Sequence, residues 1–394
     1  MAVRTLTTPV AEPSEQDSHS EISRVSSAKI DSLTGIRGAA ACWVVIYHSH
    51  RVAEKSLGLP ELKTIPIVSS GYLAVDLFFI LSGFILAANY FKKFGGQNRN
   101  SFIKFMVARI YRIFPLNTFA LIIFSIMVFS FGKIYWTGEL LNIKSFLSAL
   151  FLIQSWGFSS STAWNTPSWS LSTEWLAYFI FPIIIRIIRR VNDLKFALIG
   201  FLSSLLALTG TMIFFGRNTL DHVWLLGLPR CLFQFAAGIF LWRVLTFIDV
   251  SHRISSLFMG SGLVILVVAL IAPSLQLFAP LAFSLIIIAC ACANPLANWL
   301  FANRAVLFLG EISFSIYLMH GIVLGMFSYL ARAMDIDQTP FAAKLSFFGA
   351  MLATTLLISA LTWKFVEVPW QKLGRRANLR LGPQCTVPPE RALS

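Results

Sequence analysis

The apolar segments of this chain contain ionisable residues. Their types and positions would allow acid–base chemistry. Arg37 and His48 are eleven positions apart in one such segment. On a helix that spacing is about three turns, so both side chains project from one face roughly 16 Å apart. Because ionisable side chains are costly inside a membrane, each marks a candidate functional site. The structural alternatives are an arginine that reaches the interface and a histidine bonded to a backbone carbonyl.

Two carboxylates are predicted at the depth of His48. Asp76, in GYLAVDLFFILSGF, lies just below the outer end of the second predicted span, and Glu174, in PSWSLSTEW, begins the fourth. A carboxylate beside an imidazole fixes its tautomer and basicity, which is the recurrent arrangement behind a general base. His48, Asp76 and Glu174 are therefore predicted to form a catalytic group in the outer half of the membrane. A purely structural ion pair between His48 and Asp76 is the alternative.

The inner side carries a different pattern. Residues 92–112 contain six basic residues and no acidic one, and they end in RIYR. Arg109 and Arg112, three apart, share a helix face, and their planar guanidinium groups suit phosphates. With Arg37 nearby, this predicts an anion-binding site that opens to the cytoplasm. The general excess of basic residues in cytoplasmic loops is the alternative explanation.

Four further ionisable residues are predicted to have structural or accessory roles, through packing or hydrogen-bonded pairing: Arg230, Glu311, His320 and Glu367. Arg230 lies too deep to reach the interface and should face the protein interior. Pro369 is predicted to end the last membrane helix. The sequence shows no zinc-type spacing of Cys or His, no P-loop and no GxGxxG, so neither a metal site nor a tightly bound cofactor is predicted.

The amino-acid composition indicates that these segments lie in a lipid bilayer. The chain has 394 residues, of which 56% are hydrophobic and 13% charged, with 36 Phe and 11 Trp. Soluble domains carry about 25% charged residues, so an ordinary soluble protein is excluded. Unbroken apolar runs exclude a β-barrel, whose strands alternate. The fold class is therefore all-α, a polytopic transmembrane bundle, and its net charge of +14 is attributed to cytoplasmic loops rather than to nucleic-acid binding.

A spanning helix needs about 20 apolar residues, and ten such spans are predicted. Lys and Arg are nearly three times as frequent on one predicted side as on the other, which places both termini in the cytoplasm. Residues 132–170 form the longest outer segment, with an interfacial helix at about 140–153. The predicted spans are 34–53, 71–91, 113–131, 171–188, 195–215, 223–242, 255–272, 275–293, 306–330 and 342–363.

Three regions follow from this pattern. Residues 1–30 are polar and predict a disordered cytoplasmic tail. Residues 31–373 form the transmembrane domain, and residues 374–394 a basic cytoplasmic tail. No internal repeat is visible, which disfavours a transporter built from inverted repeats.

Six segments, taken in order, resemble the acyltransferase-3 family of integral membrane O-acyltransferases. The resemblance extends from Ile30 to Leu373, and it rests on six motifs occurring in the expected order rather than on any one of them. The motifs are LTGIRGAAACWVVIYH, GYLAVDLFFILSGFIL, RIYRIFPL, SWSLSTEWLAYFIFP, FLGEISFSIYLMH and FVEVPWQ.

The resemblance implies transfer of an acyl group, usually acetyl from acetyl-CoA as co-substrate, onto a hydroxyl of a carbohydrate or lipid-linked glycan. The family's acceptors include surface polysaccharides, lipopolysaccharide and other glycosylated products. By resemblance His48 is catalytic, while Arg37, Arg109 and Arg112 bind the acyl donor. The chain is expected to act in a bacterial cytoplasmic membrane, without the C-terminal esterase-like domain of some members.

These expectations combine in one mechanistic hypothesis. His48, oriented by Asp76, would remove the acceptor's proton during attack on the thioester, and Arg37 would stabilise the developing charge. A route through an acyl-histidine is the mechanistic alternative. A transporter or flippase of a lipid-linked saccharide, and a polysaccharide polymerase or membrane glycosyltransferase, are the alternatives from other classes. Release of CoA would distinguish an acyltransferase from each of them.

Overall fold

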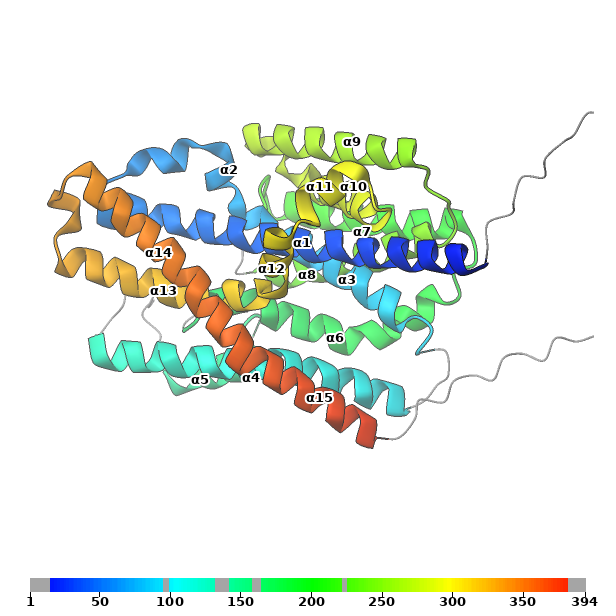
Figure 1. Ribbon diagram of the computed structural model, residues 1–394, viewed down its shortest axis with the longest axis horizontal. Helices are drawn as coiled ribbons and strands as arrows, with labels where there is room; N and C mark the ends of the chain where they lie inside the picture. The colour runs from blue at the N-terminus through cyan, green and yellow to red at the C-terminus, as the bar shows by residue number, and fades with distance from the viewer. Residues whose placement is uncertain (1–14, 95–98, 132–141, 158–163, 222–224, 382–394) are drawn as a thin grey trace, which may run out of the picture.

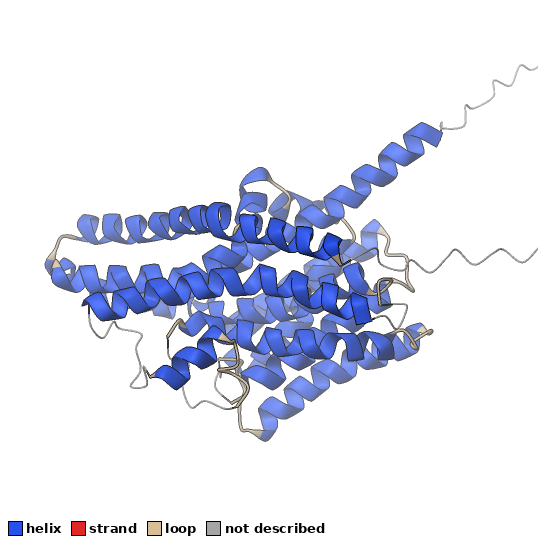
Figure 2. Ribbon diagram, turned by 90° about the horizontal axis from the view of Figure 1, so that it is seen from below, coloured by secondary structure: helices blue, strands red, loops and turns tan. Residues whose placement is uncertain are grey.

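The protein is seen in a computed structural model that describes residues 15–94, 99–131, 142–157, 164–221 and 225–381. Every regular element in these ranges is helical (Figure 2), which confirms the all-α prediction. The long helices run side by side along the long axis of the molecule (Figure 1). The fold is therefore a helical bundle. Polar side chains inside it must find hydrogen-bond partners on neighbouring helices.

The elements, in chain order, are α1 (Glu15–Leu57), η1 (Pro60–Thr64), α2 (Pro66–Ser69), η2 (Gly71–Leu73), α3 (Ala74–Tyr90), α4 (Arg99–Phe131), α5 (Ile143–Leu150), η3 (Thr166–Ser168), α6 (Trp169–Ile188), α7 (Leu194–Phe214), α8 (Gly227–Leu245), α9 (His252–Ile271), η4 (Pro273–Phe278), α10 (Ala279–Ala291), α11 (Pro295–Phe301), α12 (Arg304–Glu311), α13 (Ser313–Ala333), η5 (Ile336–Gln338), α14 (Phe341–Thr362), the π-helical turn η6 (Trp363–Glu367) and α15 (Val368–Arg380). Polar residues at the loop ends begin several of them, as where Asp193 Oδ1 accepts from Lys195 N at 2.7 Å.

Nine helical stretches in the described part of the chain are long and apolar enough to cross a membrane. They correspond to nine of the ten predicted spans and make this an integral, multi-pass membrane protein. They are Gly71–Tyr90, Asn100–Phe131, Thr166–Ile188, Leu194–Phe214, Gly227–Leu245, His252–Ile271, Pro273–Ala291, Ser313–Ala333 and Phe341–Arg380.

The remaining predicted span, 34–53, lies within α1. Arg37, His48 and His50 lower its hydropathy, so it is less apolar than the other nine. The helix nevertheless packs among α3, α10, α12 and α13, where neighbouring helices rather than lipid surround its polar groups. The start of α1 and the end of α15 lie at the same end of the bundle (Figure 1), as an even number of crossings requires.

Two sequence predictions about the helices need correction, and a third is confirmed. Helix α1 begins at Glu15, so residues 15–30 are helical rather than disordered, while residues 1–14 lie outside the described ranges. The predicted span 306–330 is two helices, α12 and α13, with Ile312 between them. The interfacial helix predicted at about 140–153 is present as α5.

Pro369 does not end the last helix, because α14, η6 and α15 follow one another without a break to Arg380. The wide π turn comes just before Pro369 and places it in the first turn of α15, where its missing N–H is tolerated. Residues 374–380 of the predicted basic tail therefore belong to a helix, and residues 382–394 lie outside the described ranges.

Helices α3 and α8 cross at very short range because glycines lie at the contact. A Cβ atom on Gly83 would lie 2.0 Å from the carbonyl oxygen of Phe235, and one on Gly238 would lie 1.9 Å from that of Ile80. Small residues allow such close approach between membrane helices. The crossing fixes the relative positions of the polar side chains of α3 and α8 that lie about one helical turn away.

Candidate functional site

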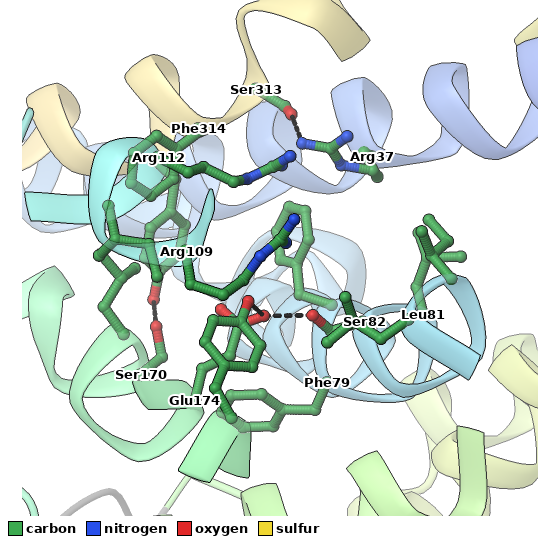
Figure 3. Close-up of a pocket in the computed structure, with 17 residues that line it drawn as sticks. Arg37, Phe79, Leu81, Ser82, Arg109, Arg112, Ser170, Glu174, Ser313 and Phe314 are labelled. Carbon is green, nitrogen blue, oxygen red and sulfur yellow. Dashed lines mark hydrogen bonds between the residues drawn. The ribbon is translucent and has the colours of Figure 1, made fainter. Parts of the chain in front are cut away.

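A cavity of about 130 Å³ lies where α1, α3, α4, α6 and α13 converge (Figure 3). We call it the arginine cavity. The guanidinium groups of Arg37, Arg109 and Arg112 face into it, opposite Glu174 and Ser82. The predicted gathering of these three arginines is therefore seen in the structure. With three cations and one carboxylate, the cavity suits an anion.

Contacts with neighbouring helices orient the arginines. Arg37 Nη2 donates to Ser313 Oγ at 3.1 Å, which ties α1 to the start of α13. The guanidinium of Arg109 lies 5.7 Å from the ring centre of Phe105 and 5.8 Å from that of Tyr178. Its Nε is buried and has no hydrogen-bond partner among the described residues. This buried N–H group is available to donate a hydrogen bond to a ligand.

Glu174 lies in the arginine cavity, not beside His48, so its predicted place in the outer catalytic group is wrong. The hydroxyls of Ser82 and Tyr178 both donate to Oε1 of Glu174. The span that carries it begins at Thr166 rather than at residue 171, because η3 supplies the outer turn. Glu174 is consequently deeper than the sequence suggested.

Asp76 is also not where it was predicted, because it pairs with Arg230 and does not contact His48. Arg230 Nε donates to Oδ1 at 2.7 Å and Nη2 donates to Oδ2 at 2.6 Å. Gln234 donates to the same carboxylate, and both charged side chains are buried. A buried carboxylate with a bidentate arginine has its hydrogen-bonding capacity met. The pair joins α3 to α8 beside their glycine crossing.

His48 instead meets His320, which the sequence assigned only an accessory role. His320 Nε2 lies 3.3 Å from His48 Nδ1, and the ring centres are 5.0 Å apart. His48 Nδ1 also lies 3.0 Å from the carbonyl oxygen of Val44, and His320 Nδ1 lies 3.2 Å from that of Ile316.

These carbonyls determine where the protons lie in a neutral pair. A carbonyl only accepts, so Nδ1 of His320 carries a proton toward Ile316 and Nε2 holds the lone pair. His48 Nδ1 then carries its proton toward Val44 and His320 together, which leaves the lone pair of His48 on Nε2. In this tautomer Nε2 of His48 is the ring nitrogen that can accept a proton.

The two histidines border a very small cavity of about 10 Å³, which we call the histidine pocket. Such a volume holds about one water molecule. Aromatic and polar residues from the segment before α6 close it. Its lining comprises His48, Phe124, Trp164, Asn165, Thr166, Pro167, His320 and Gly321.

A hydrogen bond separates the arginine cavity from the histidine pocket. Ser170 Oγ and the Tyr317 hydroxyl lie 2.6 Å apart, both buried, and both residues line the arginine cavity. Pro167 and His320, three residues from each, line the histidine pocket. The distance along α1 from Arg37 to His48 is about 16 Å, at 1.5 Å for each residue. The two polar regions are therefore consecutive along the bundle axis.

Glu311 and Glu367, the remaining predicted residues, line a second cavity beside α15. Glu367 accepts from Ser315 Oγ and from Gln371 Nε2, each at 3.0 Å, and Glu311 is exposed nearby. Ser170, Tyr317 and Ser313 also line the arginine cavity and were not predicted as site residues. Their signal was hydroxyl residues three to five positions apart within apolar helices, a pattern that packing alone also produces.

The fold and the site define a class: a membrane-spanning helical bundle with a cavity lined by three arginines and a pair of histidines in contact. The family described as an acyltransferase domain, Acyl_transf_3, matches residues 30–364. The chain belongs to this family, which confirms the resemblance seen in its six motifs.

Two relatives carry informative names. Over 174 residues the chain is 32% identical to "Acyltransferase MdmB" of Streptomyces mycarofaciens, covering 41% of each protein. Over 385 residues it is 23% identical to "O-acetyltransferase OatA" of Staphylococcus aureus, covering 88% of this chain and 58% of the relative. The chain thus spans about half the length of these relatives. No solved structure gives a significant match.

Proposed function

We propose that this chain is a membrane O-acyltransferase that transfers an acyl group, acetyl from acetyl-CoA, to a hydroxyl of a carbohydrate acceptor. The observation that carries the proposal is the placement of an arginine cavity and a histidine pair one after the other along α1 and α13. The family membership supports acyl transfer. The excess of Lys and Arg at one end of the bundle supports a donor supplied from the cytoplasmic side, and the bacterial relatives support a bacterial cytoplasmic membrane.

In this proposal the donor's phosphates bind Arg37, Arg109 and Arg112, because charge-assisted hydrogen bonds to guanidinium groups are strong and well oriented. The uncharged arm would displace the hydrogen bond between Ser170 and Tyr317 and bring the thioester toward His48. The arm has to bridge about 16 Å along α1. Glu174, held by Ser82 and Tyr178, limits the excess positive charge of the cavity.

The histidine pair would then perform the transfer. His48 Nε2 takes the proton of the acceptor hydroxyl while its oxygen attacks the thioester carbonyl. The carbon–oxygen bond forms, the carbon–sulfur bond breaks, and the thiolate leaves with the proton returned by His48. His320 Nε2 accepts a hydrogen bond from His48 Nδ1 and stabilises the imidazolium that forms between these steps. In the alternative, His48 Nε2 attacks the thioester itself and forms an acyl-histidine.

The test is labelled acetyl transfer in membranes that contain wild type, His48→Ala or His50→Ala. A crude glycan extract serves as acceptor, and CoA thiol is measured in parallel. His50 is the matched control because it lies on the same helix and its Nδ1 bonds to the carbonyl oxygen of Tyr47. We expect His48→Ala to abolish both signals, and His50→Ala to retain them.

Equal label and thiol release in wild type and His48→Ala would show that His48 is structural. Glycan translocation without thiol release in wild type would favour the transporter. To separate the two chemical routes, protein is incubated with labelled donor alone, and label retained on His48 would favour the acyl-histidine.

A further inference from the structure

A second cavity, of about 330 Å³, adjoins the arginine cavity on its inner side. We call it the vestibule. Arg37 and Arg112 line both cavities, so the two are contiguous. The walls of the vestibule come from α1, α4, α12, the π turn and α15. Its charged lining comprises four cations and two carboxylates: Arg37, Arg112, Lys372, Arg375, Glu311 and Glu367.

The charges of the vestibule leave two cations at its rim for a ligand. Glu367 is buried and already accepts two hydrogen bonds, from Ser315 and Gln371. Lys372 and Arg375 are exposed, and within the described part of the chain neither forms a hydrogen bond or an ion pair. With a net excess of two positive charges, the vestibule attracts an anion.

Helix α15 presents these cations in a fixed position. It continues directly from the π turn, a feature that often occurs at functional sites. Asn378 Nδ2 donates to the carbonyl oxygen of Lys104 at 3.1 Å, and the rings of Tyr111 and Trp370 lie 6.0 Å apart. These contacts dock α15 onto α4 and place the rim of the vestibule against the bundle.

We propose that the vestibule binds the nucleotide end of the acyl donor, with Lys372 and Arg375 on its ribose phosphomonoester. This assignment rests on the proposed function and extends it. Arg37 and Arg112, at the boundary between the cavities, bind the diphosphate of the same donor. A phosphomonoester carries nearly two negative charges at neutral pH and pairs well with exposed cations.

The order of the chemistry along the bundle matches such a ligand. Exposed cations come first, half-buried arginines next, then the Ser170–Tyr317 pair and the histidine pocket. A CoA thioester has the same order: a phosphomonoester, a diphosphate, an uncharged arm and the reacting carbonyl. A lipid phosphate has the same head-group chemistry, but its single phosphate group would meet only one of the two pairs of cations, so the donor is the better match.

The test measures binding of CoA and of 3′-dephospho-CoA to the purified full-length protein in detergent by calorimetry. The variant is Lys372→Ala/Arg375→Ala. Its matched control is Lys364→Ala/Arg376→Ala, which removes the same charge from η6 and α15 at positions that do not line the vestibule. We expect wild type and control to bind CoA about tenfold more tightly than dephospho-CoA, as loss of charged hydrogen bonds predicts.

In the vestibule variant this preference should fall to near unity, while affinity for dephospho-CoA stays close to wild type. A preference that persists in the variant would overturn the proposal. Protein in nanodiscs with and without phosphatidylglycerol provides the lipid arm, and competition by that lipid with no preference between the nucleotides would assign the vestibule to a lipid phosphate. Absence of CoA binding in the wild type would instead reject the proposed function together with this site.

Discussion

Backbone carbonyls, rather than a carboxylate, orient the two histidines of the histidine pocket. Val44 and Ile316 each lie one helical turn before the histidine they contact, so the tautomers follow from helix geometry. Asp76, the carboxylate that the sequence assigned to this role, is held by Arg230 and Gln234. At the residue scale, His320 therefore stands where Asp76 was predicted, in contact with His48, and no spacing in the sequence connects these two histidines.

Replacing His320 tests that role. In His320→Ala, His48 Nδ1 loses the acceptor nitrogen of His320, so kcat should fall about a hundredfold, within the usual range for acid–base assistance. The KM for acetyl-CoA should change little, because His320 does not line the arginine cavity. His320→Gln, whose amide oxygen can accept from His48, should recover part of the loss. Steady-state kinetics with thermal unfolding as a folding control decide this, and a raised KM with unchanged kcat would contradict it.

At the scale of elements, hydropathy located the spans because each helix must be apolar over the membrane thickness whatever its neighbours are. Hydropathy does not show which helices pack against each other. Helix α3 packs on α8, whose Arg230 lies far along the chain from Asp76, and nothing in chain order selects that partner. The three arginines could be brought together from sequence because they lie on the first predicted span and one short basic segment. The depth of Glu174 could not be predicted from the sequence, because η3 extends the span that carries it.

The α3–α8 crossing also predicts a stability effect. In Gly238→Ala the new Cβ would lie 1.9 Å from the carbonyl oxygen of Ile80, so the helices must separate and strain the buried Asp76–Arg230 pair. Overpacking of this kind costs about 1–3 kcal/mol. Gly260 on α9 has no atom within 4 Å of its Cβ position, so Gly260→Ala is the matched control. The melting temperature in detergent should fall in the first variant and hold or rise in the second. Equal melting temperatures would mean that the crossing is not tightly packed.

At the scale of the whole molecule, the vestibule, the arginine cavity and the histidine pocket form one sequence of sites that begins at the basic end of the bundle. This end also carries the start of α1 and the end of α15 (Figure 1). The excess of Lys and Arg there predicts that it faces the cytoplasm. The proposal therefore requires the donor to be used from one membrane face only.

Sealed vesicles of opposite orientation measure that sidedness. With acetyl-CoA added outside, inverted vesicles should release CoA thiol, whereas right-side-out vesicles should show almost none, because the charged donor does not cross a bilayer unaided. Permeabilising the right-side-out vesicles should restore release to the inverted level, which serves as the control for protein content. Equal release from both intact preparations, or release from right-side-out vesicles alone, would show that the vestibule is not the entrance for the donor. If the donor enters only beside α15, cytoplasmic acyl-CoA reaches the site through the basic end of the bundle. The acceptor would then approach from the opposite side of the membrane.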